Sequence, residues 1–492
     1  MKNADSTRDP FDLAIVGGGI TGAGLASLAA RRGLSVVLLE RRDLMSGASS
    51  ASSHMLHGGL RYLEHGHVGL VREALRERAV VSRMAPALTR PVRFLVPLYR
   101  GERVGPLRLR AGLTAYDLLA GRAAFAPHQM MGTRDALALE PGLASRGLRG
   151  AGIYTDVVMD DAQLGVAVAR DAARHGAVIR TWSEVVHARR EGARIELGLR
   201  DSITGGEDAV VARSVVLAAG PWTDAVRARL MQGLDPLSPP ARTALRPTRG
   251  THLVYPGLTA GHGLVLISRG DGRVFFVVPF GEHALVGTTE VEVPSPPRAE
   301  SLTPDLEELT YLREGLARVL PDSAAIRPLA VTTGIRPLLR AEGRANELSR
   351  EHAVFEDAGV FTVAGGKYTT FRVMARDVLV RVLRRLGYPG NGSVPADLPL
   401  PAPPADDLSL EKRVDWAVGE AFALRLEDVL RRRSRLWLEP DRARRAAPLV
   451  AARMAAQLGW SDDRTRREIA DWDVAVNEEE RLIDRALGLR TG

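Results

Sequence analysis

Three glycines near the start of the chain, Gly17, Gly19 and Gly22, restrict the fold more than any other feature of the sequence. A short apolar run, Phe11–Val16, comes directly before them, and the stretch from Ile20 to Arg32 has the pattern of a helix. A strand, a glycine-rich turn and a helix in this order predict the first part of a βαβ unit. The chain is therefore expected to have an α/β fold.

The spacing G-x-G-x-x-G between a strand and a helix is the fingerprint of dinucleotide-binding folds. The first glycine permits a tight turn, the second lets a pyrophosphate approach the backbone, and the third allows close packing of the helix. The helix N-terminus offers amide donors to the diphosphate. A second apolar run, Leu34–Leu39, leads to Glu40, whose carboxylate is expected to bind ribose hydroxyls. The fingerprint alone does not distinguish NAD from FAD.

Further elements are expected to extend this unit. Asp160 or Asp161 can cap a helix that continues through His175, and Gly176 ends it. Apolar strands are predicted at 177–180, 185–186 and 214–217.

The pattern changes between about residues 240 and 330. Segments such as THLVYP, GLVLIS, RVFFVVPF and HALVGTT predict antiparallel strands of a separate sheet, to which part of 90–150 contributes. A helix is predicted to begin at Thr303-Pro304, with proline in its first turn, and to end near Leu320. The proline-rich segment Leu398–Pro404 predicts a linker. We therefore divide the chain into residues 1–404, with the inserted sheet, and a helical C-terminal domain at 405–492.

The composition limits what the chain can do. With 492 residues it is too long for one small core, and with no cysteine it has no disulfide, thiolate metal site or cysteine nucleophile. We predict no metal site. No apolar run is long enough to span a membrane, and the N-terminus lacks the apolar core of a signal peptide. A run of arginines, Arg431–Arg433, is predicted on a solvated or an interdomain face.

The net charge of +8 and the isoelectric point near 10.1 allow two explanations. The charge can belong to a solvated arginine-rich surface, or it can attract an anionic surface. Because nothing resembles a nucleic-acid module, we expect no nucleic-acid partner and favour lipid headgroups. Val104–Ala120 places leucines and Tyr116 on an apolar face beside Arg103, Arg108 and Arg110. That pattern fits a lipid interface or an ordinary packed helix, so we expect a cytoplasmic protein with peripheral membrane contact.

Residues Ser49–Glu64, SSASSHMLHGGLRYLE, combine small hydroxyl residues, two histidines, a Gly-Gly step and an Arg-Tyr pair. A surface loop does not need this mixture, and a buried core could not easily satisfy it. We predict that the segment surrounds an anionic cofactor and an anionic substrate.

This segment belongs to a set of motifs that also includes GGGITGAG (17–24), AAGPWTD (218–224), RGTHLVYP (249–256), VGTTE (286–290), GIRPLL (334–339), GGKYTTFR (365–372) and LEDVLRRRSRL (426–436). With these motifs the chain resembles the FAD-dependent glycerol-3-phosphate dehydrogenases of the D-amino-acid-oxidase-like flavoprotein group. The resemblance implies a Rossmann-like FAD-binding domain with an inserted antiparallel-sheet substrate domain and a helical C-terminal domain. It also implies non-covalent FAD, oxidation of sn-glycerol 3-phosphate to dihydroxyacetone phosphate, and transfer of electrons to a quinone.

The resemblance assigns roles to individual positions. The residues implied in FAD binding, beside the three fingerprint glycines and Glu40, are Ser49, Ser52, Ser53, Val185, Gly220, Gly334, Gly365 and Gly366. The residues implied near the flavin in catalysis are His252, Arg336 and His57. The residues implied in substrate binding are Arg61, Tyr62, Arg273, Arg350 and Lys367.

These residue types suit the implied chemistry. A phosphate dianion needs several converging cations, and arginine binds it through two parallel hydrogen bonds. Histidine is the ordinary base for a hydroxyl proton near neutral pH, and an arginine can stabilise developing alkoxide charge. His252 can equally be a packed histidine, and His57 can simply orient its loop. The sequence leaves open which residue accepts the proton.

Two positions depart from the family pattern. His54 stands where lysine or arginine is common, so an imidazole replaces a permanent charge, and Glu290 stands where aspartate is usual. Other functions also remain open: an oxidase that reduces oxygen, an amine or hydroxy-acid oxidoreductase of the same fold, an RNA-binding flavoprotein, or a flavin-bound scaffold. The electron acceptor and the oligomeric state, including a homodimer, are not fixed by the sequence.

Overall fold

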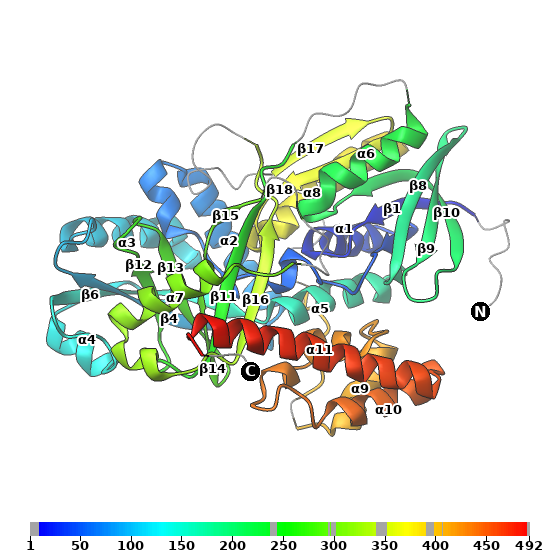
Figure 1. Ribbon diagram of the computed structural model, residues 1–492. Helices are drawn as coiled ribbons and strands as arrows, with labels where there is room; N and C mark the ends of the chain where they lie inside the picture. Colours follow the sequence, from blue (N-terminus) through cyan, green and yellow to red (C-terminus); the bar gives the residue numbers. More distant parts are fainter. Residues whose placement is uncertain are drawn as a thin grey trace.

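The computed structural model describes residues 9–236, 244–293, 296, 302–340, 352–389, 398–405 and 407–489. Two β-sheets lie side by side, and a group of C-terminal helices lies beneath them in the view of Figure 1. The long helix α11 (Asp462–Ala486) runs from the remaining C-terminal helices to the second sheet (Figure 1). The α/β fold and the helical C-terminal part predicted from the sequence are confirmed.

The first sheet contains the predicted βαβ unit. Its strands run in the order β17–β18–β10–β1–β2–β7, and β9 and β8 continue from β10. The strands β18, β10, β1, β2 and β7 are parallel to one another. The bounds are β1 Phe11–Val16, β2 Val36–Leu39, β7 Val178–Arg180, β8 Ser183–Glu191, β9 Arg194–Asp201, β10 Glu207–Leu217, β17 His352–Asp357 and β18 Val360–Gly365.

Helices cover both faces of this sheet. One face packs against α1 (Ile20–Arg31), α5 (Asp161–Arg174) and α8 (Phe371–Leu386), and the other against α6 (Thr223–Leu234). Of the two predicted caps for α5, Asp160 is the one that accepts a hydrogen bond from the backbone of Gln163. The buried faces of these helices fix the carboxyl ends of the parallel strands, where ligands bind in such folds.

The second sheet contains the predicted strands between residues 240 and 330. Its order is β15–β11–β14–β13–β12–β4–β6–β3, with β16 on the other side of β11 and β5 beside β6. All pairs are antiparallel except β4 with β12. The bounds are β3 Met55–Leu56, β4 Thr89–Tyr99, β5 Gln129–Met131, β6 Leu148–Met159, β11 Thr248–Pro256, β12 Gly263–Ile267, β13 Val274–Phe280, β14 His283–Gly287, β15 Val291–Glu292 and β16 Ala330–Arg336.

Two pairs of helices flank the second sheet. On one face α4 (Thr133–Leu139) and α7 (Leu306–Val319) enclose a core, and on the other α2 (Val68–Met84) and α3 (Pro106–Ala120) do so. The predicted start of α7 at Thr303-Pro304 is wrong. Asp305 is the N-cap, and it forms a capping box with Glu308 that fixes the first turn after the proline.

The C-terminal part consists of α9 (Leu410–Gly419), a π-helical turn (Asp428–Arg433), α10 (Ala447–Leu458) and α11. No strand occurs between residues 407 and 489. The predicted linker, Leu398–Pro404, has no regular structure but is held in place, because Leu400 donates to the carbonyl of Met84 and Arg170 donates to the linker backbone. The division at residues 404–405 stays a prediction.

The arginine run Arg431–Arg433 lies between the two parts of the chain and not in solvent. Both oxygens of Asp43, at the end of the first βαβ unit, accept hydrogen bonds from Arg433, and Arg432 donates to the same carboxylate. The side chains of Asp43 and Arg433 are fully buried. The interdomain alternative therefore holds, and the ion pair crosses the interface.

Among the described residues, no helix combines the length and the apolar character that a membrane span requires.

The buried ion pair predicts a large effect of a single substitution. Asp43→Ala leaves two arginines in a buried site without their shared carboxylate, and breaking such a pair costs about 3–5 kcal/mol of unfolding free energy. Denaturant unfolding measures the loss. The control is Arg466→Ala, because Arg466 pairs with Asp463 at the surface and both side chains are more than 70% exposed. A loss no larger than in the control would contradict the assignment.

Candidate flavin and substrate site

The glycine fingerprint brings α1 against the ends of two strands. Gly17 has φ +116°, and a Cβ on it would lie 2.3 Å from the carbonyl oxygen of Ala218 at the end of β10. A Cβ on Gly22 would lie 1.9 Å from the carbonyl oxygen of Gly17. Side chains at either position would therefore push the helix away from the sheet, and the helix N-terminus would no longer point at the cofactor cavity.

Two side chains brace this turn. Ser49 accepts a hydrogen bond from the amide of Ile20 (3.0 Å), and Glu40 accepts from the amides of Gly18 (2.6 Å) and Arg42 (2.9 Å). Burial raises the pKa of Glu40, while these amide donors oppose the rise. Glu40 thus holds the backbone of the fingerprint turn, a role that the sequence analysis did not assign to it.

A cavity of about 810 Å³ lies at the carboxyl ends of β1, β2, β10 and β18. Gly17 and Gly19 present bare backbone to it, so the phosphates of a dinucleotide can approach the amides of α1. The predicted FAD-binding residues that line it are Gly17, Gly19, Glu40, Ser49, Val185, Gly220, Gly365 and Gly366. Gly22 is not on the wall of this cavity, and its contribution is the close packing of α1 against Gly17.

A second cavity of about 550 Å³ adjoins the first, because Ala48, Pro337, Gly366, Lys367 and Tyr368 line both. It lies between the two sheets. The remaining predicted residues on its wall are Ser52, Ser53, His57, Arg61, Tyr62, His252, Arg273, Gly334, Arg336 and Lys367. Arg350 lies outside the described residues. The structure thus brings together the predicted catalytic residues and four of the five predicted substrate-binding residues.

His252 lies in the middle of β11 and is only 2% exposed. Its Nε2 is 2.9 Å from the hydroxyl oxygen of Ser53, and its Nδ1 is buried without a hydrogen-bond partner among the described residues. Burial holds the pKa of His252 well below its usual range, and Arg336 and His54 add to the effect. The imidazole is therefore neutral near pH 7 and is able to accept a proton.

Arg336 ends β16 and reaches toward the same cavity. Its Nη2 donates to the hydroxyl of Thr288 (2.6 Å) and to the carbonyl of Thr289 (3.1 Å). Gly250 makes room for the guanidinium, because a Cβ there would lie 2.2 Å from Nη2. The ammonium of Lys367 lies 3.9 Å from the centre of the Tyr62 ring, which is a cation–π contact. Arginine, lysine and a neutral histidine therefore converge on one cavity.

The comparisons with known proteins agree with this geometry. The family model described as FAD dependent oxidoreductase matches residues 12–376. The chain belongs to this family. FAD is its cofactor, and the cavity at the fingerprint accommodates it. A second model, described as the C-terminal domain of alpha-glycerophosphate oxidase, matches residues 401–465.

Individual relatives cover most of the chain. A glycerol-3-phosphate dehydrogenase of Mycobacterium leprae is 34% identical over 96% of this chain and 89% of its own length. An aerobic glycerol-3-phosphate dehydrogenase of Staphylococcus aureus is 36% identical over 77% and 68%. A solved structure of the Bacillus halodurans glycerol-3-phosphate dehydrogenase with FAD covers 98% of this chain and 96% of that one, with a TM-score of 0.75 and 22% identity. That structure supports the fold.

The two departures from the family pattern lie in different places. His54 lines neither of these two cavities: its ring is 4.2 Å from that of Phe280, and its Nδ1 lies 3.2 Å from the carbonyl of Met159 and 3.5 Å from Asp161. Glu290 lines the substrate cavity, and its Oε1 is buried without a hydrogen-bond partner in the described part of the chain.

The sequence analysis did not identify the residues that hold the loop from Ser52 to Gly58. Asp161 accepts hydrogen bonds from the backbone and the hydroxyl of Ser52. Tyr116 on α3 accepts from the amide of Gly58 (2.8 Å) and donates to Asp156. The only sequence signal was the position of Asp161 at the start of a helix. The pairing of Tyr116 with a glycine 58 residues earlier has no local signature.

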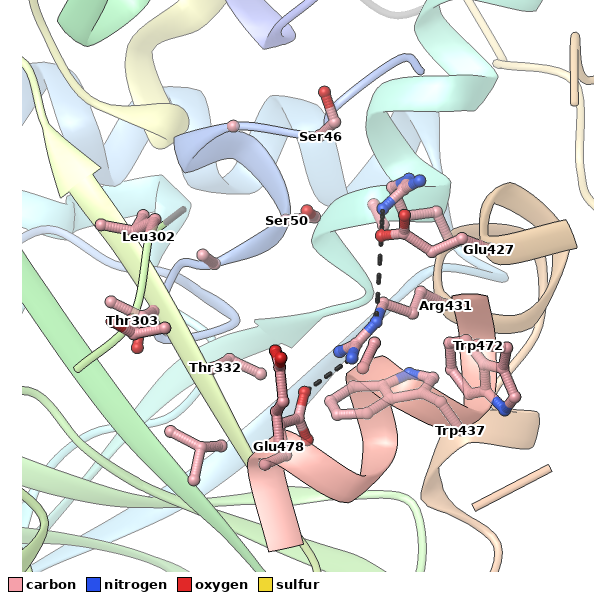
Figure 2. Close-up of a pocket in the computed structure, with 18 of the residues that line it drawn as sticks. Ser46, Ser50, Leu302, Thr303, Thr332, Glu427, Arg431, Trp437, Trp472 and Glu478 are labelled. Carbon is pink, nitrogen blue, oxygen red and sulfur yellow. Dashed lines mark hydrogen bonds and ion pairs between the residues drawn. The ribbon is translucent and has the colours of Figure 1, made fainter. Parts of the chain in front are cut away.

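A third cavity, of about 880 Å³, lies between the FAD-binding part and the C-terminal helices (Figure 2). The guanidinium carbon of Arg431 lies 5.5 Å from the ring centre of Trp437 and 5.3 Å from that of Trp472, and Arg431 pairs with Glu427 and Glu479. Most of the charges on this wall are paired with one another, so we regard the cavity as part of the interface. Among the described residues, no group of three or more histidine, aspartate or glutamate side chains is arranged to hold a metal ion.

The packing of Gly22 predicts that alanine at this position disturbs FAD binding. Its Cβ would lie 1.9 Å from the backbone of Gly17, so α1 must shift away from the diphosphate. We expect Gly22→Ala to purify with little flavin while circular dichroism shows a folded chain, and flavin absorbance per protein measures the loss. Gly69→Ala is the control, because a Cβ on this helical glycine meets nothing within 4 Å. Full FAD occupancy in Gly22→Ala would refute the packing argument.

Proposed function

We propose that this protein oxidises sn-glycerol 3-phosphate to dihydroxyacetone phosphate with FAD and passes the electrons to a quinone. The observation that carries the proposal is the convergence of Arg61, Arg336 and Lys367 with His252 on a cavity that adjoins the FAD cavity. The names of the relatives that span nearly the whole chain support the substrate.

The cations suit the phosphate end of this substrate. A phosphate dianion buried in a cavity needs more than one positive charge, and guanidinium groups give it paired hydrogen bonds. Lys367 supplies a point charge whose position is fixed by the ring of Tyr62. Arg273 also lines the cavity, although it donates to the backbone of Glu290 and contacts Asp271. We propose that these side chains hold the phosphate and orient C2 toward the cofactor.

His252 and Arg336 suit the reacting end. A neutral buried imidazole can take the hydroxyl proton, and the guanidinium of Arg336 stabilises the negative charge that develops on the oxygen. When bound, FAD supplies the acceptor for the hydride of C2 and for the onward transfer of electrons.

We propose a quinone as the electron acceptor because of the side chains on the rest of the substrate-cavity wall. Away from the cations, the substrate cavity is lined by apolar side chains, which suit a quinone ring better than a hydrophilic acceptor; they include Leu60, Leu63, Val104, Leu109, Val265 and Phe276. The alternative is an oxidase that reduces oxygen, as in the solved L-alpha-glycerophosphate oxidase of Mycoplasma pneumoniae, which shares 17% identity. Peroxide yield against the reduction of a quinone analogue separates the two.

The role of Arg336 predicts a specific defect. Arg336→Ala removes a charge-assisted contact to the substrate, so anaerobic bleaching of the flavin by glycerol 3-phosphate is expected to slow by roughly 100-fold. FAD is expected to stay bound, since Arg336 lies outside the FAD cavity. Stopped-flow absorbance measures the rate. Arg269→Ala is the control, because Arg269 is exposed and lines neither cavity. Unimpaired bleaching in Arg336→Ala would overturn the assigned role.

We also propose that α3 docks on an anionic lipid surface. Its inward stripe, with Leu109, Leu113 and Tyr116, is buried against the protein. Its outward stripe carries Leu107 and Leu118, which are 84% and 76% exposed. Arginines at 103, 108, 110 and 122 are exposed around this second stripe. Exposed leucines flanked by arginines suit a bilayer interface with anionic headgroups.

Docking by α3 predicts a separation of membrane binding from catalysis. The double variant Leu107→Asp with Leu118→Asp is expected to lose binding to vesicles of an anionic phospholipid, while bleaching by glycerol 3-phosphate stays unchanged. Vesicle sedimentation measures binding. Leu449→Asp is the control: Leu449 is 66% exposed on α10, and its replacement should leave binding intact. Equal vesicle binding by the wild type, the double variant and Leu449→Asp would rule out α3 as the docking helix.

A further inference from the structure

The side chain that contacts Nε2 of His252 is Ser53. The imidazole is almost fully covered, and its Nδ1 is buried, so a substrate cannot reach that nitrogen. The other nitrogen, Nε2, is occupied by the hydroxyl of Ser53 at 2.9 Å. Ser53 and His252 both line the substrate cavity. A hydroxyl group entering this cavity therefore has access to the base through the oxygen of Ser53.

The loop that carries Ser53 is fixed from behind. The carboxylate of Asp161, which is completely buried, accepts from the amide of Ser52 (3.1 Å) and from its hydroxyl (2.6 Å). The oxygen of Ser52 in turn accepts from the amide of His54 (3.1 Å). These bonds fix the backbone on both sides of Ser53. The serine hydroxyl is thus positioned before the substrate binds, as a proton-transferring group must be.

We propose that Ser53 relays the substrate proton to His252; the relay rests on the proposed function. The O–H bond of the C2 hydroxyl breaks, and its proton moves to the oxygen of Ser53. The O–H bond of Ser53 breaks in the same step, and that proton moves to Nε2 of His252. The hydride of C2 goes to FAD, so the substrate loses two electrons and becomes a ketone. Ser53 ends the step as a neutral hydroxyl.

Besides burial, the groups that lower the pKa of His252 are Arg336 on β16 and His54 on the loop. Removing the serine oxygen leaves a gap between the substrate hydroxyl and Nε2 but leaves the side chains of Arg336 and His54 in place. A merely structural serine would affect FAD content or stability, whereas a relay also determines how the rate depends on pH.

The test compares Ser53→Ala, Ser53→Thr and Ser50→Ala with the wild-type holoenzyme. Ser50 lies on the same loop but faces the interface cavity (Figure 2), so it is the matched control. Anaerobic bleaching of the flavin absorbance by glycerol 3-phosphate is measured at a series of pH values. Only enzyme that contains FAD contributes to the signal, so a loss of flavin lowers the amplitude of the absorbance change but not the bleaching rate. The flavin of Ser53→Ala should bleach about 100-fold more slowly or slower still. Its bleaching rate should also no longer fall at low pH, since that fall reflects protonation of His252. Ser53→Thr should recover most of the rate, and Ser50→Ala should match wild type.

A Ser53→Ala enzyme that bleaches at the wild-type rate with the same acid limb would overturn the relay. So would a Ser53→Thr enzyme as slow as Ser53→Ala. If glycerol 3-phosphate fails to bleach the wild-type flavin and a hydroxy acid succeeds, the proposed function fails. The same variants compared with that other substrate then decide the relay separately.

Discussion

The ion pairs of the Asp43 carboxylate hold the C-terminal helices against the FAD-binding part of the chain. Asp43 follows the first βαβ unit and precedes the loop that carries Ser49 and Ser53, and it binds Arg432 and Arg433 from the C-terminal helices. Two guanidinium groups buried around one carboxylate cannot separate without leaving charge unpaired in the interior. The C-terminal helices are therefore tied to the segment that forms the wall between the interface cavity and the FAD cavity.

The site itself is built where the two sheets meet. The parallel sheet supplies the FAD cavity through its glycine turn, and β11 and β16 of the second sheet supply His252 and Arg336. Neither sheet contains the complete site. Arg336 reaches the cavity from the end of β16, and its Nη2 donates to the hydroxyl of Thr288 and to the carbonyl of Thr289 on the neighbouring strand connection.

The sequence predicted the fold where local pattern and tertiary structure agree. The strand Phe11–Val16 and the helix after it follow directly from glycine spacing and periodicity, and the strands between 248 and 287 follow from alternation. The start of α7 was missed because a capping box at Asp305 outweighs the preference of proline for a first turn. The site residues were predicted by resemblance. Their supports, Asp161 and Tyr116, could not be, since these contacts join distant segments through tertiary packing.

Tyr116 connects α3 to the substrate cavity. Its hydroxyl accepts a hydrogen bond from the amide of Gly58, next to His57, so a helix with an exposed outer stripe is joined to a loop on the wall of the substrate cavity. A movement of α3 would therefore also move this loop. Attempts to make the protein more soluble should therefore alter only the outward positions of α3, because Leu113 and Tyr116 are buried in the core and Leu109 lines the substrate cavity.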